Sequence, residues 1–330
     1  MAATSASLRG PSRRDRAVEW PTLAVAAVIY TGFAALTWFH QALPWWLLLP
    51  LGGYLVAWQG SLQHECVHHH PTRWRWFNEA LATPSLWLWL PFRTYRDSHL
   101  AHHRDERLTD PLDDPESYYL TAAQWRRCNA ATRLLLRFRN TLLGRLLIGP
   151  LLAVHGLWRE QLPRLLRGER RVWKDWAPHA LGCALVLGWV VGVCDIGLAE
   201  YVALYAYPGL SLTLLRSFAE HRAEEEPANR SVIVDAGWPL ALLFLNNNLH
   251  ALHHRDPAVP WYDLPARYRH ERARILAANG NYRFRGYGEI VRHYLLRPKE
   301  ALVHPHYRPV LEAHPGNAPY RPEFDGENRE

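Results

Sequence analysis

The stretch Pro44-WWLLLPLGGYLVAWQGSLQHECVHH-His70 decides the fold of this chain. Its first part, Pro44–Leu62, is an uncharged apolar run of 19 residues. As a helix this run is about 29 Å long, which is close to the roughly 30 Å thickness of the hydrocarbon layer of a bilayer. The run is followed at once by His64 and His68, whose spacing of four residues places both on one helix face. The sequence therefore predicts a membrane-spanning helix with a histidine motif at its end.

Three further apolar runs have a similar length, and they complete two pairs. Thr22–Phe39 precedes the quoted stretch by a short link, and Trp176–Cys194 is separated from Ile196–Leu215 by the single residue Asp195. We expect an all-α integral membrane protein with two transmembrane helical hairpins, hence four spans. The alternative is a soluble protein with two buried hairpins, but paired uncharged runs of this length are typical of membrane proteins.

The distribution of charge predicts the orientation of these spans. The chain has 330 residues with 38 Lys and Arg against 31 Asp and Glu, a formal charge of +7. All 38 basic residues lie before Pro21, between Gln63 and Lys174, or after Leu215, on one side of a four-span topology. The positive-inside rule then makes both termini and the middle loop cytoplasmic. We expect a multi-pass protein of the bacterial inner membrane, whose Arg-rich loops face anionic lipid rather than nucleic acid.

The remaining chain is expected to form a cytoplasmic helical cap. Three shorter apolar stretches suit interfacial or re-entrant helices that pack this cap against the bilayer, namely Ala80–Phe92, Leu142–Trp158 and Pro239–Leu252. We expect one membrane-bound domain over residues 22–300. It is preceded by a cytoplasmic tail over 1–21 and followed by a Pro/His-rich tail over 301–330.

Histidines at metal-ligand spacing recur three times on the predicted cytoplasmic side. The motifs are His64-x-x-x-His68, His99-x-x-His102-His103 and His250-x-x-His253-His254, and His221 follows the fourth apolar run at the depth of the first motif. Neutral imidazoles suit iron, copper, zinc and nickel. Eight or nine of them exceed the capacity of one ion, so the pattern predicts a pair of metal ions. The four cysteines form no Cys-x-x-Cys pair, which excludes zinc-ribbon and thioredoxin-like chemistry.

Two other functions would account for part of this pattern. His64-Glu-Cys-Val-His68 satisfies the H-E-x-x-H pattern of zinc proteases, in which the glutamate is the general base, and it would suit an intramembrane protease. That assignment leaves the other two motifs unexplained. A non-catalytic metal-binding or transport protein would need ionisable groups within its spans. The first hairpin has none, and Asp195 and Glu200 of the second lie near its outer turn.

The three histidine boxes, in this order beside paired spans, resemble the membrane-bound fatty acid desaturase superfamily. The likeness covers roughly residues 45–265. It implies a non-haem di-iron centre that activates O₂ to attack an unactivated C–H bond. Carried over residue by residue, the ligands are His64, His68, His99, His102, His103, His221, His250, His253 and His254. The resemblance favours a fatty acyl desaturase, with a hydroxylase of alkyl chains or carotenoids as the nearest rival.

The same resemblance points to residues that support the metal ligands. Glu65, Asp97, Glu220 and Asp256 are candidates to accept imidazole N–H groups. The animal acyl-CoA desaturase branch has an Asn four residues before the histidine that corresponds to His221, and this chain has Ser217 there. Asn246, Asn247 or Asn248 is expected to supply the amide instead. Asp110, Asp113 and Asp114 are expected to form only a turn.

The substrate and the electrons must both come from outside the chain. We expect a lipid or acyl-chain substrate to enter from the bilayer. No flavin- or dinucleotide-binding glycine loop is present in the sequence, so we also expect a separate electron donor of the ferredoxin, rubredoxin or cytochrome type.

Overall fold

Helices α1 (Trp20–Trp38) and α2 (Trp45–Val67) form the first predicted hairpin in the computed structural model, which describes residues 18–308. The turn between them is a short 3₁₀ helix over His40–Ala42. Pro21 at the start of α1 suits a position where the backbone N–H has no helical partner. The predicted N-terminal tail lies largely outside the described residues.

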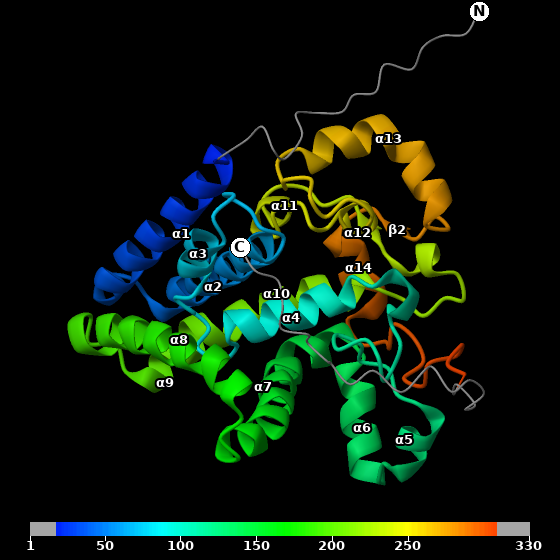
Figure 1. Cartoon of the computed structure of the whole chain (residues 1–330), viewed down its shortest axis with the longest axis horizontal. Coiled ribbons are helices and arrows are strands. Elements are labelled where there is room, and N and C mark those ends of the chain that lie inside the picture. The colour runs from blue at the N-terminus through cyan, green and yellow to red at the C-terminus, as the bar shows by residue number, and fades with distance from the viewer. Residues whose placement is uncertain (1–17, 309–330) are drawn as a thin grey trace, which may run out of the picture.

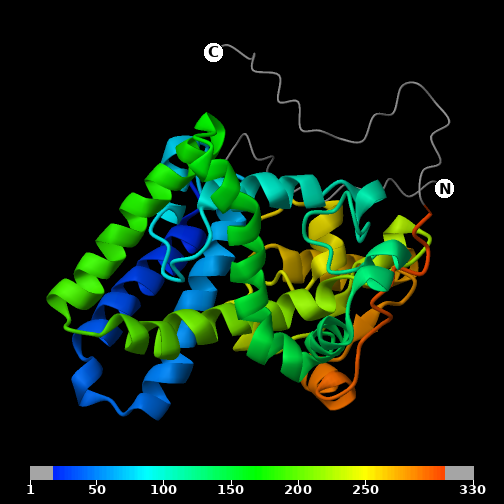
Figure 2. The same cartoon turned by 90° about the horizontal axis from the view of Figure 1, so that it is seen from below.

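The second predicted hairpin consists of α8 (Arg170–Leu187) and α10 (Tyr207–Glu220), and each helix is extended by a π-helical segment. A π-helix over Gly188–Val193 prolongs α8, and α9 (Leu198–Tyr201) with a π-helix over Val202–Ala206 leads into α10. Figure 1 shows α1, α2, α8 and α9 at one end of the molecule, and Figure 2 shows the same helices from below. The four expected helices are therefore present.

Fewer helices qualify as membrane spans than the sequence suggested. By length and composition, Trp20–Trp38 and Arg170–Val193 are apolar enough to cross a bilayer. A third candidate arises if α6 (Ala130–Arg139) and α7 (Leu142–Leu166), which are bent by 115° relative to each other, count as one broken span or re-entrant loop. The prediction of four spans is thus not confirmed, although two or three are supported.

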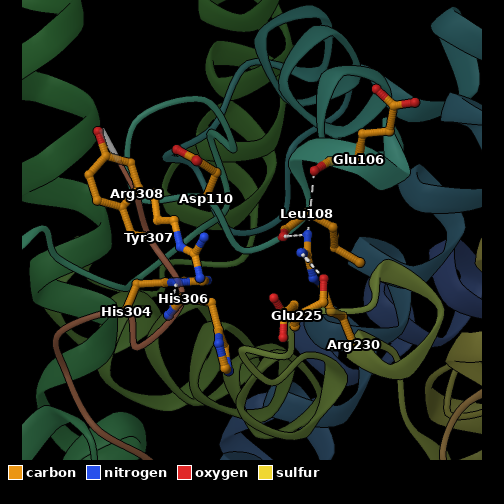
Figure 3. A pocket seen from close by; sticks show the side chains of 9 residues that line it. All are labelled: Glu106, Leu108, Asp110, Glu225, Arg230, His304, His306, Tyr307 and Arg308. Carbon is orange, nitrogen blue, oxygen red and sulfur yellow. Dashed lines mark hydrogen bonds between the residues drawn. The ribbon is translucent and has the colours of Figure 1, made fainter. Parts of the chain in front are cut away.

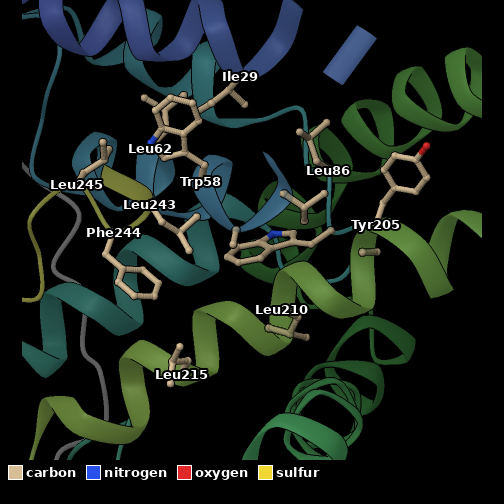
Figure 4. Close-up of a cluster of buried hydrophobic side chains, with 14 of the residues drawn as sticks. Ile29, Trp58, Leu62, Leu86, Tyr205, Leu210, Leu215, Leu243, Phe244 and Leu245 are labelled. Carbon is tan, nitrogen blue, oxygen red and sulfur yellow. The ribbon is translucent and has the colours of Figure 1, made fainter. Parts of the chain in front are cut away.

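The core of the molecule is the contact of α2 with α10 and with the π-helical segment before it. Glycines permit this close approach: a Cβ on Gly209 would lie 2.5 Å from a methyl carbon of Val56, and one on Gly52 would lie 2.6 Å from the Tyr205 ring. Apolar side chains then close the space between the helices (Figure 4), and Leu62 is fully buried among them. This packing fixes the end of α2, where the first histidine box begins.

The cap is built from shorter elements. These are α3 (Arg75–Ala82), α4 (Phe92–His102), η3 (Asp105–Arg107), α5 (Ala122–Arg127), η6 (Pro227–Arg230), β1 (Ile233–Val234), α11 (Leu240–Leu243), α12 (His250–Arg255), α13 (Leu264–Ala278), β2 (Arg283–Phe284) and α14 (Tyr287–Tyr294). The two strands pair in parallel over two residues each. The described chain is otherwise helical or irregular, so the predicted all-α class holds in outline.

The three shorter apolar stretches differ from the prediction. Ala80–Phe92 is not one helix: α3 ends at Ala82, and an irregular segment that contains Pro84 and Pro91 leads into α4, because proline interrupts helical hydrogen bonding. Pro239–Leu252 is divided between α11 and the start of α12, while Leu142–Trp158 lies within α7. Of the predicted C-terminal tail, residues 301–308 are described, and Val303 pairs with Leu120. The rest of that tail lies outside the described residues.

Candidate metal centre

Three helices end at the histidine cluster, and a fourth begins there. The histidines of the first box lie at the end of α2, those of the second box end α4, and His221 directly follows α10. The third box opens α12 at His250. The C-terminus of a helix carries a partial negative charge, so three such ends favour cations at this place.

All nine predicted histidines come together, and they divide into two groups. Within each group, one nitrogen from every imidazole lies within 4.8 Å of the others. The first group is His64, His68, His99, His103 and His253, and the second is His102, His221, His250 and His254. Sequence neighbours such as His102 and His103 thus serve different groups, because adjacent residues of a helix point about 100° apart. The predicted pair of sites has a structural basis.

The nitrogens within each group converge at the separation of ligands around one ion. Nε2 of His221 lies 3.0 Å from Nε2 of His102 and 2.9 Å from Nε2 of His250. In the first group, Nε2 of His103 lies 3.0 Å from that of His99 and 3.2 Å from that of His253. Two nitrogens about 2.1 Å from a metal and at right angles to each other are about 3.0 Å apart. The donor set therefore fits a metal ion in each group.

Hydrogen bonds to the outer ring nitrogens determine where the imidazole protons lie. Nδ1 of His99 donates to Glu116 Oε1 and Nδ1 of His102 donates to Asp114 Oδ1, both at 2.9 Å. Nδ1 of His250 donates to Asn247 Oδ1 at 3.0 Å. Each inward Nε2 then carries a lone pair. Lone pairs facing one another at about 3 Å repel, and a cation between them removes the repulsion.

The direction of the pKa shift favours the neutral, metal-binding form for eight of the nine imidazoles. Burial lowers the pKa of eight imidazoles, which keeps them neutral as metal ligands must be: His64, His68, His99, His103, His221, His250, His253 and His254. Burial also acts to lower the pKa of His102, but the carboxylates of Glu116 and Asp114 raise it to about 9.

The predicted supporting residues are divided by the structure. Asn247 connects the two groups: its amide oxygen accepts from His250, and its amide N–H donates to Nε2 of His64 at 3.2 Å. Glu220 Oε1 lies 3.4 Å from Nδ1 of His250, and Glu65 Oε1 lies 3.6 Å from Nδ1 of His64. These three belong to the immediate surroundings of the cluster.

The other three predicted supporting residues bind elsewhere. Asp97 pairs with Arg96 at 2.8 Å and with Arg171 at 3.0 Å. Asp256 pairs with Arg255 at 2.7 Å and with Arg267 at 3.2 Å. The Ser217 hydroxyl donates to the carbonyl of Leu214 at 3.4 Å. The arginines adjoining each aspartate in sequence were the signal that these carboxylates had closer partners than the imidazoles.

Four supporting residues were missed from sequence. Asp114 accepts a hydrogen bond from His102, and Glu116 accepts one from His99. The Ser231 hydroxyl oxygen lies 3.3 Å from Nδ1 of His221. The expectation that Asp114 belongs only to a turn is wrong, although Asp110 does form one by accepting the N–H groups of the residues two and three positions on. The fourth is Arg216, which is buried and pairs with Glu220 at 3.2 Å. Its place directly after a long uncharged run was a signal for it.

Several histidines outside the two groups are also buried. His70 donates to Glu19 at 2.6 Å, and His40 and His179 are largely enclosed by their surroundings. A cavity of about 290 Å³ lies beside His304 and His306, with Arg230 and Glu225 in its wall (Figure 3).

This cavity is linked to the second group of histidines. Nε2 of His304 donates to the Thr109 hydroxyl at 3.1 Å, and the Thr109 N–H donates to Asp114 Oδ2 at 2.8 Å. Because Asp114 also accepts from His102, the C-terminal segment helps to hold a candidate metal ligand.

The part of the sequence that carries the three boxes matches a family model. The model for "Fatty acid desaturase" matches residues 38–286, about three quarters of the chain, and this range includes all nine histidines. The chain belongs to the fatty acid desaturase family. The resemblance stated from the sequence is thereby confirmed, and family membership implies a membrane oxidoreductase with a di-metal centre. No curated protein matches the chain.

Proposed function

We propose that this chain is an O₂-dependent membrane desaturase that introduces a double bond into a fatty acyl chain, carried as an acyl lipid or acyl thioester. The observation that carries the proposal is the division of nine histidines into groups of five and four, each with converging nitrogens, within a chain of the desaturase family. Each group would hold one non-haem iron ion. When bound, the two ions would supply the activation of O₂ and the removal of hydrogen from an unactivated C–H bond.

The chain's own residues prepare the site for this chemistry. Asp114, Glu116 and Asn247 hold protons on the outer nitrogens of three imidazoles, so the inner nitrogens are directed at the metal positions. Burial excludes bulk water, since His64 and His250 are each 1% exposed. Asn247 keeps the two groups in register because it contacts one histidine of each.

The surroundings of the enzyme follow from the same proposal. The lipid substrate reaches the centre from the bilayer, and the reducing electrons come from a separate ferredoxin, rubredoxin or cytochrome on the cytoplasmic face. Both termini and the active site are cytoplasmic in this arrangement, in the bacterial inner membrane. The confinement of all 38 basic residues to three segments of the sequence supports this orientation.

A hydroxylase of alkyl chains or carotenoids would use the same centre and differ in whether oxygen is retained in the product. Lipid mass spectrometry of an expressing bacterial host separates the two. A desaturase adds acyl chains that are two mass units lighter than their precursors, and a His253→Ala variant should abolish them. His293→Ala, which changes an exposed histidine on α14, should not. Accumulation of hydroxylated lipid or carotenoid instead would refute desaturation.

A further inference from the structure

A buried guanidinium without a counter-ion lies beside the α6–α7 bend. Arg145, in the first turn of α7, is 6% exposed, and its guanidinium lies 4.3 Å from the centre of the Tyr118 ring and 5.8 Å from that of Phe218. Its Nε and Nη2 are buried and have no hydrogen-bond partner among the described residues. Nor does any carboxylate of the described chain pair with it. A buried charge in this state is unfavourable unless an anion joins it.

A second arginine makes the local charge more positive. Arg139, the last residue of α6, donates from Nη2 to the Tyr118 carbonyl at 3.1 Å, while its Nε is buried without a partner. The positive charges of Arg139 and Arg145 repel each other. Three buried guanidinium nitrogens at one bend, Nε and Nη2 of Arg145 and Nε of Arg139, thus lack acceptors. A guanidinium group binds phosphate through a pair of neighbouring N–H groups. Nε and Nη2 of Arg145 form such a pair.

The outer face of α7 indicates where the phosphate comes from. Leu147, Leu151, Leu162 and Leu166 are between 43% and 79% exposed, and they recur at helical spacing along one side. Together α6 and α7 are apolar enough to enter a membrane as a bent pair. Lipid chains against these leucines would place a head group near the start of α7. We propose that Arg139 and Arg145 bind the phosphate group of a phospholipid. This site uses none of the nine histidines, although the Tyr118 hydroxyl beside it donates to the His221 carbonyl at 3.3 Å, and its test does not depend on the reaction.

Thermal unfolding of the full-length, delipidated protein in detergent tests the site. Micelles doped with dioleoyl phosphatidylglycerol should raise the Tm, whereas dioleoylglycerol, with the same acyl chains and no phosphate, should not. Arg145→Met and Arg139→Met should weaken the lipid affinity about tenfold or more. The matched variant Arg137→Met changes an exposed arginine of α6 and should respond like wild type. Arg145→Lys keeps the charge and tests the paired N–H groups if Arg145→Met fails to fold.

Three outcomes would overturn the proposal. Equal shifts with both lipids would mean that the acyl chains alone bind. A Tm rise with inorganic phosphate at constant ionic strength, but none with phosphatidylglycerol, would mean a site for free phosphate. A lipid-loaded Arg145→Met variant that is more stable than lipid-loaded wild type would show that the buried charge has no anionic partner.

Discussion

The Nε2 atoms of His221 and His250 lie 2.9 Å apart, although one residue follows α10 and the other begins α12. The proton of His250 is held on its Nδ1 by Asn247, so its Nε2 lone pair faces His221. Two such nitrogens share this spacing stably when a cation lies between them. A bound ion would therefore tie the ends of two distant segments together and would couple folding of the cap to metal binding.

Each histidine group should hold its own iron ion, and single variants should separate the two. We expect two iron ions per chain in the purified wild type. His250→Ala should deplete the second group, and His253→Ala the first. About one ion should remain in each case, because the unmutated group keeps all of its ligands, five for His250→Ala and four for His253→Ala. Elemental analysis gives the stoichiometry, and His293→Ala is the exposed control. If a His102→Ala, His253→Ala double variant binds as much iron as wild type, the di-iron assignment fails.

Asp114 should control iron affinity without binding the metal itself. Removing its carboxylate in Asp114→Ala takes away the acceptor that orients His102, and losing such a partner typically costs about 10–100-fold in metal affinity. Competition with a chelator measures this change. Asp113→Ala alters the adjacent, more exposed carboxylate, which pairs with Arg107 at 3.4 Å, and should leave the affinity unchanged. Equal affinities for both variants would contradict the orienting role of Asp114.

Eight of the nine histidines could be found from the sequence because ligand pairs recur at helical spacing, a local property, and His221 from its position after the fourth apolar run. Their division into two groups could not, since it depends on how α2, α4, α10 and α12 meet. Asp114 is assigned to a turn from the sequence and Glu116 is not singled out, because both follow the second box in an irregular loop, where no period indicates which side chain turns inward. Asp97 was the opposite case: it is close to the box in sequence, yet Arg171 of α8 is its partner in space.

The long helices could be predicted from the length of the uncharged runs, but the number of times that the chain crosses the membrane could not. α2 and α10 have the expected positions, yet both pack against other helices along much of their length, so their apolar residues serve the core. A buried core helix and a span have the same composition. The bend between α6 and α7 was likewise invisible in composition, because it arises where Asn140 and Thr141 separate two helical runs.

Adding one methyl group to glycine should have opposite effects at two helical positions. In Gly209→Ala the new Cβ would lie 2.5 Å from a Val56 methyl carbon, so α2 and α10 must separate, at a cost of about 1–3 kcal/mol. In Gly156→Ala the Cβ meets nothing within 4 Å, and the better helix propensity of alanine should stabilise α7 by about 0.5–1 kcal/mol. Thermal unfolding in one detergent compares the two. A stabilised Gly209→Ala variant would show that the helices are not closely packed there.

The four-span orientation makes a prediction about which turns are accessible from outside an intact cell. Gln41 and Gly197 are exposed in the two outer turns, and Arg127 is exposed in the middle segment. In a background with the native cysteines replaced by serine, Gln41→Cys and Gly197→Cys should react with a membrane-impermeant maleimide in spheroplasts. Arg127→Cys should react only after lysis. If only α1 and Arg170–Val193 cross the membrane, Gln41 and Arg127 both lie outside and Gly197 lies inside. Arg127→Cys would then be labelled in spheroplasts, and Gly197→Cys would not. The three variants together thus distinguish four crossings from two.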